Sequence, residues 1–398
     1  MMIITSVDEY MLKAAITETA VPAHPVVCRV NTDEGIYGYG EAGIFCGYGQ
    51  HAVFGIVQDI AEQYLGTDPL DGEVTWERIR TQMNGKLSGG GGIIWSGFSA
   101  LDIATMDIKG KVLGVPCYRL IGGKQNPKLS CYASHVQNGW NEIIRPLGAA
   151  SEYADMAEMI QKLGYTAVKF DFLQFDRDGR PLSRQETANG LDKRFIRDLV
   201  EERFAAIRER CGSMMILMDN LCRLDVSGSW ELGRLAEKYE VAFMEECLDP
   251  FFAENYLQVE KKVHVPLAGG EKVQTRWGFA KYFEKQIFRI IQPEITNCGG
   301  LNEAKKICDM AHAYDVKAQA HVCGTGIAQA AALHLETAIP NFTVHEDLWC
   351  NGHHDITDYC KYNYAVKDGW ISAPEIPGLG NELTDKAIRE AELHVLVR

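Results

Sequence analysis

Three short apolar runs in this chain each end in an acidic residue, and the acids are evenly spaced. They are Asp219, Glu245 and Glu271, each 26 positions after the one before. Continuous apolar runs of this length are typical of strands in a parallel sheet that is covered on both faces. Residues 230–239, between the first two runs, carry apolar side chains at helical spacing. The pattern predicts successive βα units of a barrel, in which catalytic residues follow the C-terminal ends of the strands.

The same three carboxylates predict a metal site. In a barrel the C-terminal ends of neighbouring strands meet at one face, so the acids would converge. Oxygen donors with neither thiolate nor imidazole among them favour a hard cation such as Mg²⁺. Strands often end in a polar residue that has no chemical role, but three acids at an equal step are difficult to explain in that way. We therefore predict that Asp219, Glu245 and Glu271 bind Mg²⁺.

The composition of the 398-residue chain is that of an ordinary globular protein, long enough for a barrel and a second domain. Apolar residues make up 46% of it, which is ample for a large core. The net charge of −14 disfavours nucleic acids and anionic membranes as partners. No apolar run resembles a signal peptide or reaches transmembrane length, and the twelve cysteines show no repeated C-x-x-C pattern. We expect reduced thiols and a cytoplasmic location.

Three regions are predicted along the chain. Residues 1–125 are expected to form an α+β domain, because strand-like alternation gives way to helical periodicity. Residues 126–362 alternate strand and helix patterns and form the predicted barrel. Residues 363–398 contain no further βα unit, and we expect them to return to the N-terminal domain. The glycine-rich segments 43–49 and 85–92 lack the order of a phosphate-binding loop, which leaves a lid or a linker as interpretations.

Five further polar residues fall at the ends of predicted strands. Lys169 and Asp171 are two apart, so their side chains face the same way, either beside the metal or in an ion pair at the edge of the core. His321 ends a later strand, and Glu294 on the neighbouring strand could hydrogen-bond one ring nitrogen and leave the other to move a proton. The alternative is a structural histidine. Glu346 lies two positions beyond the last predicted strand, residues 342–344.

A metal and a base beside it suit one chemical strategy. The proton on the carbon next to a carboxylate is very weakly acidic, and its removal produces a dianionic enediolate. A divalent metal stabilises that charge as it develops. A second catalyst then either returns a proton to the opposite face, which is racemisation, or helps to expel a β-hydroxyl, which is dehydration.

Nearly the whole chain resembles the mandelate racemase subgroup of the enolase superfamily. The segment 100–114 is similar to the family's helix at the entry to the barrel, and the Glu-Glu doublet at 245–246 is similar to its second metal-ligand position. The Gln-Pro-Glu at 292–294 resembles the family's Gln-Pro-Asp, whose acid supports the catalytic histidine of the next strand, here His321. Glu346 corresponds to an electrophilic acid of the family.

This resemblance implies an α/β fold in which an N-terminal α+β capping domain precedes a modified TIM barrel, (β/α)7β. It also implies Mg²⁺ as cofactor, a small-molecule carboxylate as substrate, and abstraction of the proton α to that carboxylate. His321 would be the acid/base and Glu294 its support. By analogy with the family we expect an even-numbered homo-oligomer.

The chain departs from the family pattern in several places. Glu294 is one methylene longer than the usual Asp. The motif at 169–171 is Lys-Phe-Asp in place of Lys-x-Lys, which favours one-faced elimination over two-faced racemisation and leaves Asp171 as a base or as a partner of Lys169 or of a substrate hydroxyl. Ile295 replaces the lysine typical of the muconate-lactonizing subgroup. Leu221 replaces a histidine of mannonate and galactonate dehydratases.

The first hypothesis is an Mg²⁺-dependent dehydratase of a sugar acid, an aldonate or aldarate, that produces a 2-keto-3-deoxy acid. Lys169 would stabilise the substrate carboxylate or the enediolate, and Glu346 would hydrogen-bond the same oxygen. The alternatives are a racemase, epimerase or lactone isomerase that uses the same intermediate, and a binding protein with a vestigial metal site. The choice of sugar would depend on three loop segments. These are 43–51, 84–92 and 172–193.

Overall fold

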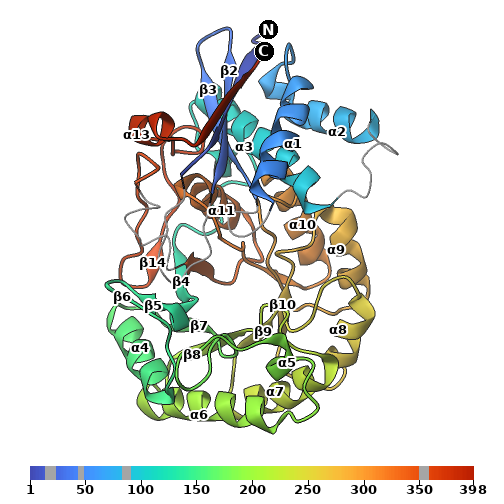
Figure 1. The fold of residues 1–398 in the computed structure, drawn as a ribbon. Coiled ribbons are helices and arrows are strands. Elements are labelled where there is room, and N and C mark those ends of the chain that lie inside the picture. The colour runs from blue at the N-terminus through green and yellow to red at the C-terminus, as the bar shows by residue number, and fades with distance from the viewer. Residues whose placement is uncertain (14–23, 44–48, 83–90, 349–357) are drawn as a thin grey trace.

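The computed structural model of this chain describes residues 1–13, 24–43, 49–82, 91–348 and 358–398. Two sheets organise these residues, a small antiparallel sheet that contains both chain ends and a parallel sheet surrounded by helices (Figure 1). Most of each glycine-rich segment lies outside the described residues, so the interpretations as lid or linker stay open. Within the described residues, no helix has the length and apolar character to cross a membrane.

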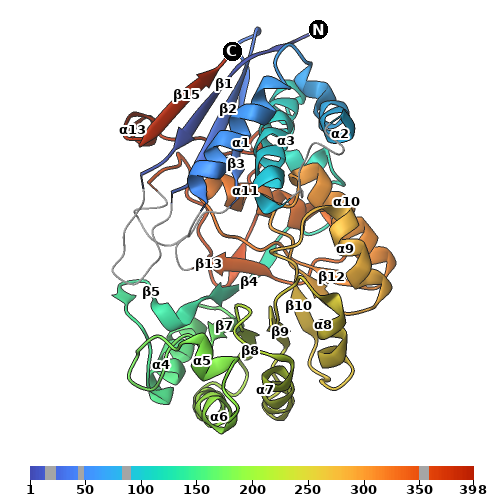
Figure 2. The ribbon, with the colours of Figure 1, turned by 45° about the vertical axis from the view of Figure 1, so that its right-hand side comes forward.

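The smaller sheet has the strand order β15-β1-β2-β3, and all of its pairs are antiparallel. β15, near the C-terminus, pairs with β1, so the end of the chain returns to its beginning (Figure 2). α1 and α3 cover one face of this sheet, and α2 packs on α3. The elements are β1 Ile4–Met11, β2 Val26–Thr32, β3 Tyr37–Ala42, α1 Gln50–Glu62, α2 Gly72–Gln82, α3 Gly92–Leu113 and β15 Leu393–Val397.

Two glycines of β3 allow α3 to lie directly against the sheet. A Cβ atom at Gly40 would stand 1.9 Å from the carbonyl oxygen of Ala100, and one at Gly38 would stand 2.1 Å from that of Ala104. Backbone contact this close leaves no room for a side chain. Residues 96–108 of α3 are all buried, because the helix lies between this sheet and the barrel.

The larger sheet is the barrel. Its strands follow the order β12-β11-β10-β9-β8-β7-β4-β13, each parallel to the next. The order returns on itself, because Ala318 of β12 bridges Phe342, just before β13. Seven strand–helix units precede β13, so the predicted (β/α)7β barrel is confirmed. The strands are β4 Leu129–Ser134, β7 Ala167–Asp171, β8 Met215–Asp219, β9 Phe243–Glu245, β10 Leu267–Gly269, β11 Ile290–Ile291, β12 Lys317–Ala318 and β13 His345–Leu348. The helices are α4 Ala150–Lys162, α6 Arg194–Arg210, α7 Val226–Lys238, α8 Ala253–Glu260, α9 Thr275–Glu284, α10 Leu301–Ala313 and α11 Gly326–Ala338.

The last barrel strand begins later than the sequence predicted. Its apolar run placed the strand at 342–344, whereas β13 begins at His345. The reason is a change of partner, since Phe342 bridges β12 but the continuous pairing with β4 starts with His345 opposite Cys131. Glu346 therefore lies within the strand and not beyond its end.

The N-terminal domain packs on the loops that follow β11 and β12. The backbone N–H of Gly43 donates to the carbonyl oxygen of Thr296 at 2.7 Å. Glu41 accepts hydrogen bonds from the N–H groups of Thr325 and Ala328 at the start of α11, and burial raises the pKa of Glu41 to about 7. Because these loops follow the carboxyl ends of strands, the domain covers the end of the barrel where the predicted site lies.

Candidate active site

The register of the barrel strands brings the predicted site residues to one end. Asp171, Asp219 and Glu245 occupy the same level on the adjacent strands β7, β8 and β9. Glu294 and His321 bridge each other just beyond β11 and β12. The strand ends converge as the spacing indicated, while the chemical roles of these residues remain predictions.

Lys169 lies at the centre of the carboxylates. Its Nζ atom is 2.7 Å from Oε1 of Glu245 and 2.9 Å from Oε1 of Glu346. Oδ2 of Asp219 lies 3.4 Å from the same nitrogen. Burial by itself disfavours the ammonium, but the carboxylates outweigh it and raise the pKa of Lys169 well above its ordinary value. One cation therefore faces three acidic side chains.

The three predicted metal ligands fit a divalent cation by charge. Oδ2 of Asp219 is buried and has no hydrogen-bond partner among the described residues, and burial raises the pKa of Glu245 well above its ordinary value. Both observations indicate carboxylates that are short of positive charge. As they stand, no three His, Cys, Asp or Glu side chains of the described residues are arranged as a coordination sphere. Glu271 is ion-paired with Lys272 at 2.5 Å. The Mg²⁺ site stays a prediction.

His321 has a carboxylate beside each ring nitrogen. Nδ1 lies 2.7 Å from Oε2 of Glu294, and Nε2 lies 3.5 Å from Oε2 of Glu271. The other oxygen of Glu294 accepts hydrogen bonds from the backbone N–H and the hydroxyl of Thr296, at 3.0 and 2.7 Å. Burial disfavours the imidazolium, but Glu271 and Glu294 outweigh it and raise the pKa of His321 to about 10. The longer Glu294 side chain thus still reaches the ring.

Asp171 is paired with Arg223. Nε of Arg223 donates to Oδ2 of Asp171 at 2.8 Å, and Oδ1 accepts a hydrogen bond from the backbone N–H of Leu173 at 2.8 Å. Burial, partly opposed by the charge of Arg223, raises the pKa of Asp171 to about 6. Among the described residues no ion pair joins Asp171 to Lys169, whose own partners are Asp219, Glu245 and Glu346. A role as a base or as a substrate contact stays open.

Glu346 connects three segments of the barrel end. It accepts a hydrogen bond from the Ser134 hydroxyl at 2.6 Å and from the backbone N–H of Val322 at 3.0 Å. Burial favours the neutral acid, but Lys169 and His321 outweigh it and lower the pKa of Glu346 below its usual range. As an anion, Glu346 accepts hydrogen bonds and does not donate them.

His135 is a further side chain at this site, and the sequence analysis missed it. It directly follows β4, and its Nε2 atom lies 3.6 Å from Oδ2 of Asp219. Its backbone φ of 55° is left-handed, which is uncommon for a residue other than glycine. Burial lowers the pKa of His135. The available signal was its position at a strand end, the same signal that identified His321.

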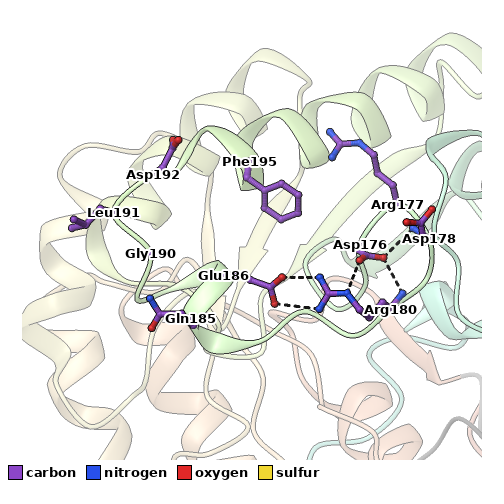
Figure 3. A pocket seen from close by; sticks show the side chains of 10 residues that line it. All are labelled: Asp176, Arg177, Asp178, Arg180, Gln185, Glu186, Gly190, Leu191, Asp192 and Phe195. Atoms are coloured by element: carbon purple, nitrogen blue, oxygen red, sulfur yellow. Dashed lines mark hydrogen bonds and ion pairs between the residues drawn. The ribbon is translucent and has the colours of Figure 1, made fainter.

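The excursion at 172–193 forms an open surface groove of about 560 Å³ beside α6 (Figure 3). Three of its charged side chains pair with one another, since Arg180 contacts Asp176 at 2.9 Å and Glu186 at 2.7 Å. None of the predicted site residues is among those that line the groove. The groove therefore lends no support to the predicted role of this excursion in selecting the sugar.

Two family models account for most of the chain. Residues 3–122 match the N-terminal domain of the mandelate racemase / muconate lactonizing enzyme family, and residues 152–387 match the enolase C-terminal domain-like family. This chain belongs to the enolase superfamily. The N-terminal match assigns it, within the superfamily, to the mandelate racemase and muconate lactonizing enzyme subgroup.

Individual members of the superfamily resemble the chain over nearly its whole length. D-galactonate dehydratase of Ralstonia nicotianae is 31% identical over 382 residues, which are 94% of this chain and 93% of that protein. D-xylonate dehydratase of Haloferax volcanii is 29% identical over 91% of this chain and 84% of that protein. The crystal structure of an enolase superfamily member from Salmonella Typhimurium has a TM-score of 0.94 and 39% identity, with 100% of both chains covered. The predicted family resemblance is confirmed.

Proposed function

We propose that this enolase-superfamily protein is a sugar acid dehydratase, a carbon–oxygen hydro-lyase that converts an aldonate or aldarate to a 2-keto-3-deoxy acid with Mg²⁺. The observation that carries the proposal is the His321–Glu294 pair, which stands beside the carboxylate of Glu271 at the barrel end. The dehydratase names of relatives that span nearly the whole chain support this class of reaction.

His321 is the acid/base of the proposed reaction. The ring acts from its neutral form, which a cation at Glu271 would favour by offsetting the carboxylate that raises the pKa of His321. Nε2 then takes the proton from C2 of the substrate, and Glu294 at Nδ1 stabilises the imidazolium that results. The same proton leaves with the hydroxyl of C3 as water, and the enol that remains becomes the 2-keto acid. One group on one face is sufficient for this sequence of steps.

Lys169 supplies positive charge where the enediolate becomes negative. Its buried ammonium is held in place by Glu245 and Glu346, so no reorganisation is needed as the charge develops. Because Glu346 is an anion in these surroundings, its predicted contact with the substrate would be to a hydroxyl or another protonated oxygen.

Asp219, Glu245 and Glu271 would hold Mg²⁺. When bound, the cation supplies charge that stabilises the enediolate oxygens. Two observations support this assignment. Oδ2 of Asp219 accepts no hydrogen bond from the described residues, and the raised pKa of Glu245 shows that the single ammonium of Lys169 does not offset its burial.

Asp171 favours elimination over racemisation. A racemase needs a second base on the opposite face of the substrate, and the lysine that serves there in the family is replaced by Asp171, which is engaged by Arg223. The alternative isomerase or epimerase would exchange the Cα proton in D₂O without loss of water. The alternative binding protein would retain affinity for an acid but show no turnover.

The test is a screen of aldonates and aldarates with Mg²⁺ in which the 2-keto product is detected. It compares the wild type with His321→Asn and with His312→Asn, an exposed control on α10. We expect turnover by the wild type and the control, and a loss of about 10³-fold in His321→Asn that remains folded and binds Mg²⁺. Equal activity of His321→Asn would exclude His321 from the mechanism. Cα exchange without a keto product would indicate an isomerase, and neither reaction would favour the binding protein.

The proposal includes four further properties of the protein. They are the division at 1–125, 126–362 and 363–398, the even-numbered homo-oligomer, the cytoplasmic location, and the absence of nucleic-acid and membrane partners. The net charge of −14 supports the last of these.

A further inference from the structure

The ring of His135 is held in one protonation form by a buried amide. Gln137 is fully buried, and its Oε1 accepts a hydrogen bond from the backbone N–H of Asp171 at 3.0 Å. Because a backbone N–H can only donate, this contact fixes which end of the amide is oxygen and which is nitrogen. The Nε2 group of Gln137 then donates to Oε1 of Gln174 at 2.6 Å and lies 3.2 Å from Nδ1 of His135.

The orientation of Gln137 decides where His135 carries its proton. An amide NH₂ has no lone pair to offer, so Nδ1 of His135 must accept, and the single ring proton is on Nε2. If the ring were an imidazolium, its Nδ1–H would point at the NH₂ group of Gln137, and two donors would repel each other. His135 is thus a neutral ring with Nε2–H as its one donor.

This donor faces the proposed site and has no acceptor of its own in the part of the chain that the structure describes. Oδ2 of Asp219, the carboxylate oxygen that Nε2 faces, is 3.6 Å away, beyond hydrogen-bond distance. That oxygen accepts no hydrogen bond from the described residues and lies 3.4 Å from Nζ of Lys169. A protonated Nε2 also cannot ligate a metal ion, because its lone pair is absent. The backbone of His135 is left-handed, with φ 55°. Backbone strain of this kind is often found at functional sites.

We propose that His135, through its Nε2–H, donates a hydrogen bond to an oxygen of the bound sugar acid, and that Gln137 is the positioning residue that keeps the ring neutral. The inference rests on the proposed function, which supplies the ligand. His135 adds a donor-only contact on the Asp219 side of the site, opposite in character to His321, which lies beside Glu271.

The experiment compares the wild type, His135→Asn and the control His312→Asn. Asn tolerates left-handed backbone, so the variant is expected to fold. We expect kcat/KM for the sugar acid to fall by about 100-fold in His135→Asn, the cost of one lost donor, with Mg²⁺ affinity unchanged by titration calorimetry. In ¹⁵N spectra of histidine-labelled protein, the signals that His135→Asn removes should be those of a ring protonated at Nε2 and bare at Nδ1.

Each other outcome overturns the inference. Unchanged kcat/KM in His135→Asn would show that no substrate oxygen uses the donor. Loss of Mg²⁺ affinity would make His135 part of the metal site, and a proton on Nδ1 would refute the role of Gln137. The failure of the proposed function looks different, since the wild type itself would then turn over no sugar acid.

Discussion

His321 and His135 follow two different barrel strands, and each has its Nε2 atom near one carboxylate of the same group. The distances are 3.5 Å to Glu271 and 3.6 Å to Asp219. The two rings differ in what touches Nδ1, which is the carboxylate of Glu294 for His321 and the amide of Gln137 for His135. A carboxylate accepts a proton and favours the imidazolium, whereas an amide NH₂ donates one and excludes it.

The comparison shows that the partner, and not the residue type, decides what a strand-end histidine can do. With Glu294 behind it, His321 is able to take up and return a proton. With Gln137 behind it, His135 can only donate a hydrogen bond and keeps its proton. The following predictions exchange or remove these partners.

Glu294→Gln should give His321 the surroundings of His135. The Gln oxygen can keep the hydrogen bonds from Thr296, so its NH₂ group faces Nδ1 of His321. The ring proton is then forced onto Nε2, the nitrogen that must be free to accept the substrate proton. We expect turnover to fall by about 10³- to 10⁴-fold, as expected for a catalytic histidine in the wrong tautomer. Steady-state kinetics at saturating Mg²⁺ measures it, and a loss below tenfold would contradict the role of Glu294.

A third histidine sharpens the comparison, because His334 is buried with no carboxylate beside either nitrogen. It accepts a hydrogen bond from the N–H of Tyr118 and donates to the carbonyl of Leu379, and burial lowers the pKa of His334 to about 4. Since this folded pKa lies below the ordinary 6.5, the unfolded chain binds the proton first. The stabilisation present above pH 6.5 is therefore lost as the pH falls to 4, by about 3 kcal/mol in total.

Denaturant unfolding between pH 7 and pH 4 checks this expectation. His334→Gln can keep both hydrogen bonds but cannot titrate, so its free energy of unfolding should depend less on pH than that of the wild type. His312→Gln, at an exposed position, should behave as the wild type. Parallel pH profiles of wild type and His334→Gln would show that this ring does not titrate on unfolding.

Mg²⁺ should affect both site histidines and leave His334 unchanged. A cation held by Asp219 and Glu271 would lie near both Nε2 atoms, so their ¹⁵N signals should move on titration. At a hundredfold excess over Kd, Mg²⁺ should raise the free energy of unfolding by about 2.7 kcal/mol. Asp219→Asn should abolish both responses. Stabilisation that persists in Asp219→Asn would place the cation elsewhere.

Gln137→Glu should give His135 the surroundings of His321. A carboxylate at this position can still accept from the N–H of Asp171, but it also accepts from Nδ1 and favours a charged ring. We expect a 10- to 100-fold lower kcat/KM, the usual cost of a changed supporting residue. The matched control is Gln161→Glu, which adds the same charge at a partly exposed position on α4. An equal fall in kcat/KM for the two substitutions would show that the added negative charge, and not the contact with His135, causes the loss.

Much of this architecture could be predicted from local sequence. The even spacing of Asp219, Glu245 and Glu271 identified barrel strands, because apolar runs and the acids that end them are properties of contiguous residues. The same reasoning located Glu294 and His321, since a parallel barrel places consecutive strand ends side by side. The misplaced start of the last strand, at 342 and not His345, shows the limit, because pairing partners change along that segment.

What the sequence alone determined was therefore the fold class, the family and the group of residues at one end of the barrel. Only the tertiary structure decided the protonation and the partners of each side chain. Asp171 is engaged by Arg223, 52 positions away, and Gln137 is oriented by Asp171, 34 positions away. Protonation depends on such contacts, because burial and the nearest donor or acceptor set the free energy of each charged form, and these come from segments that only folding brings together.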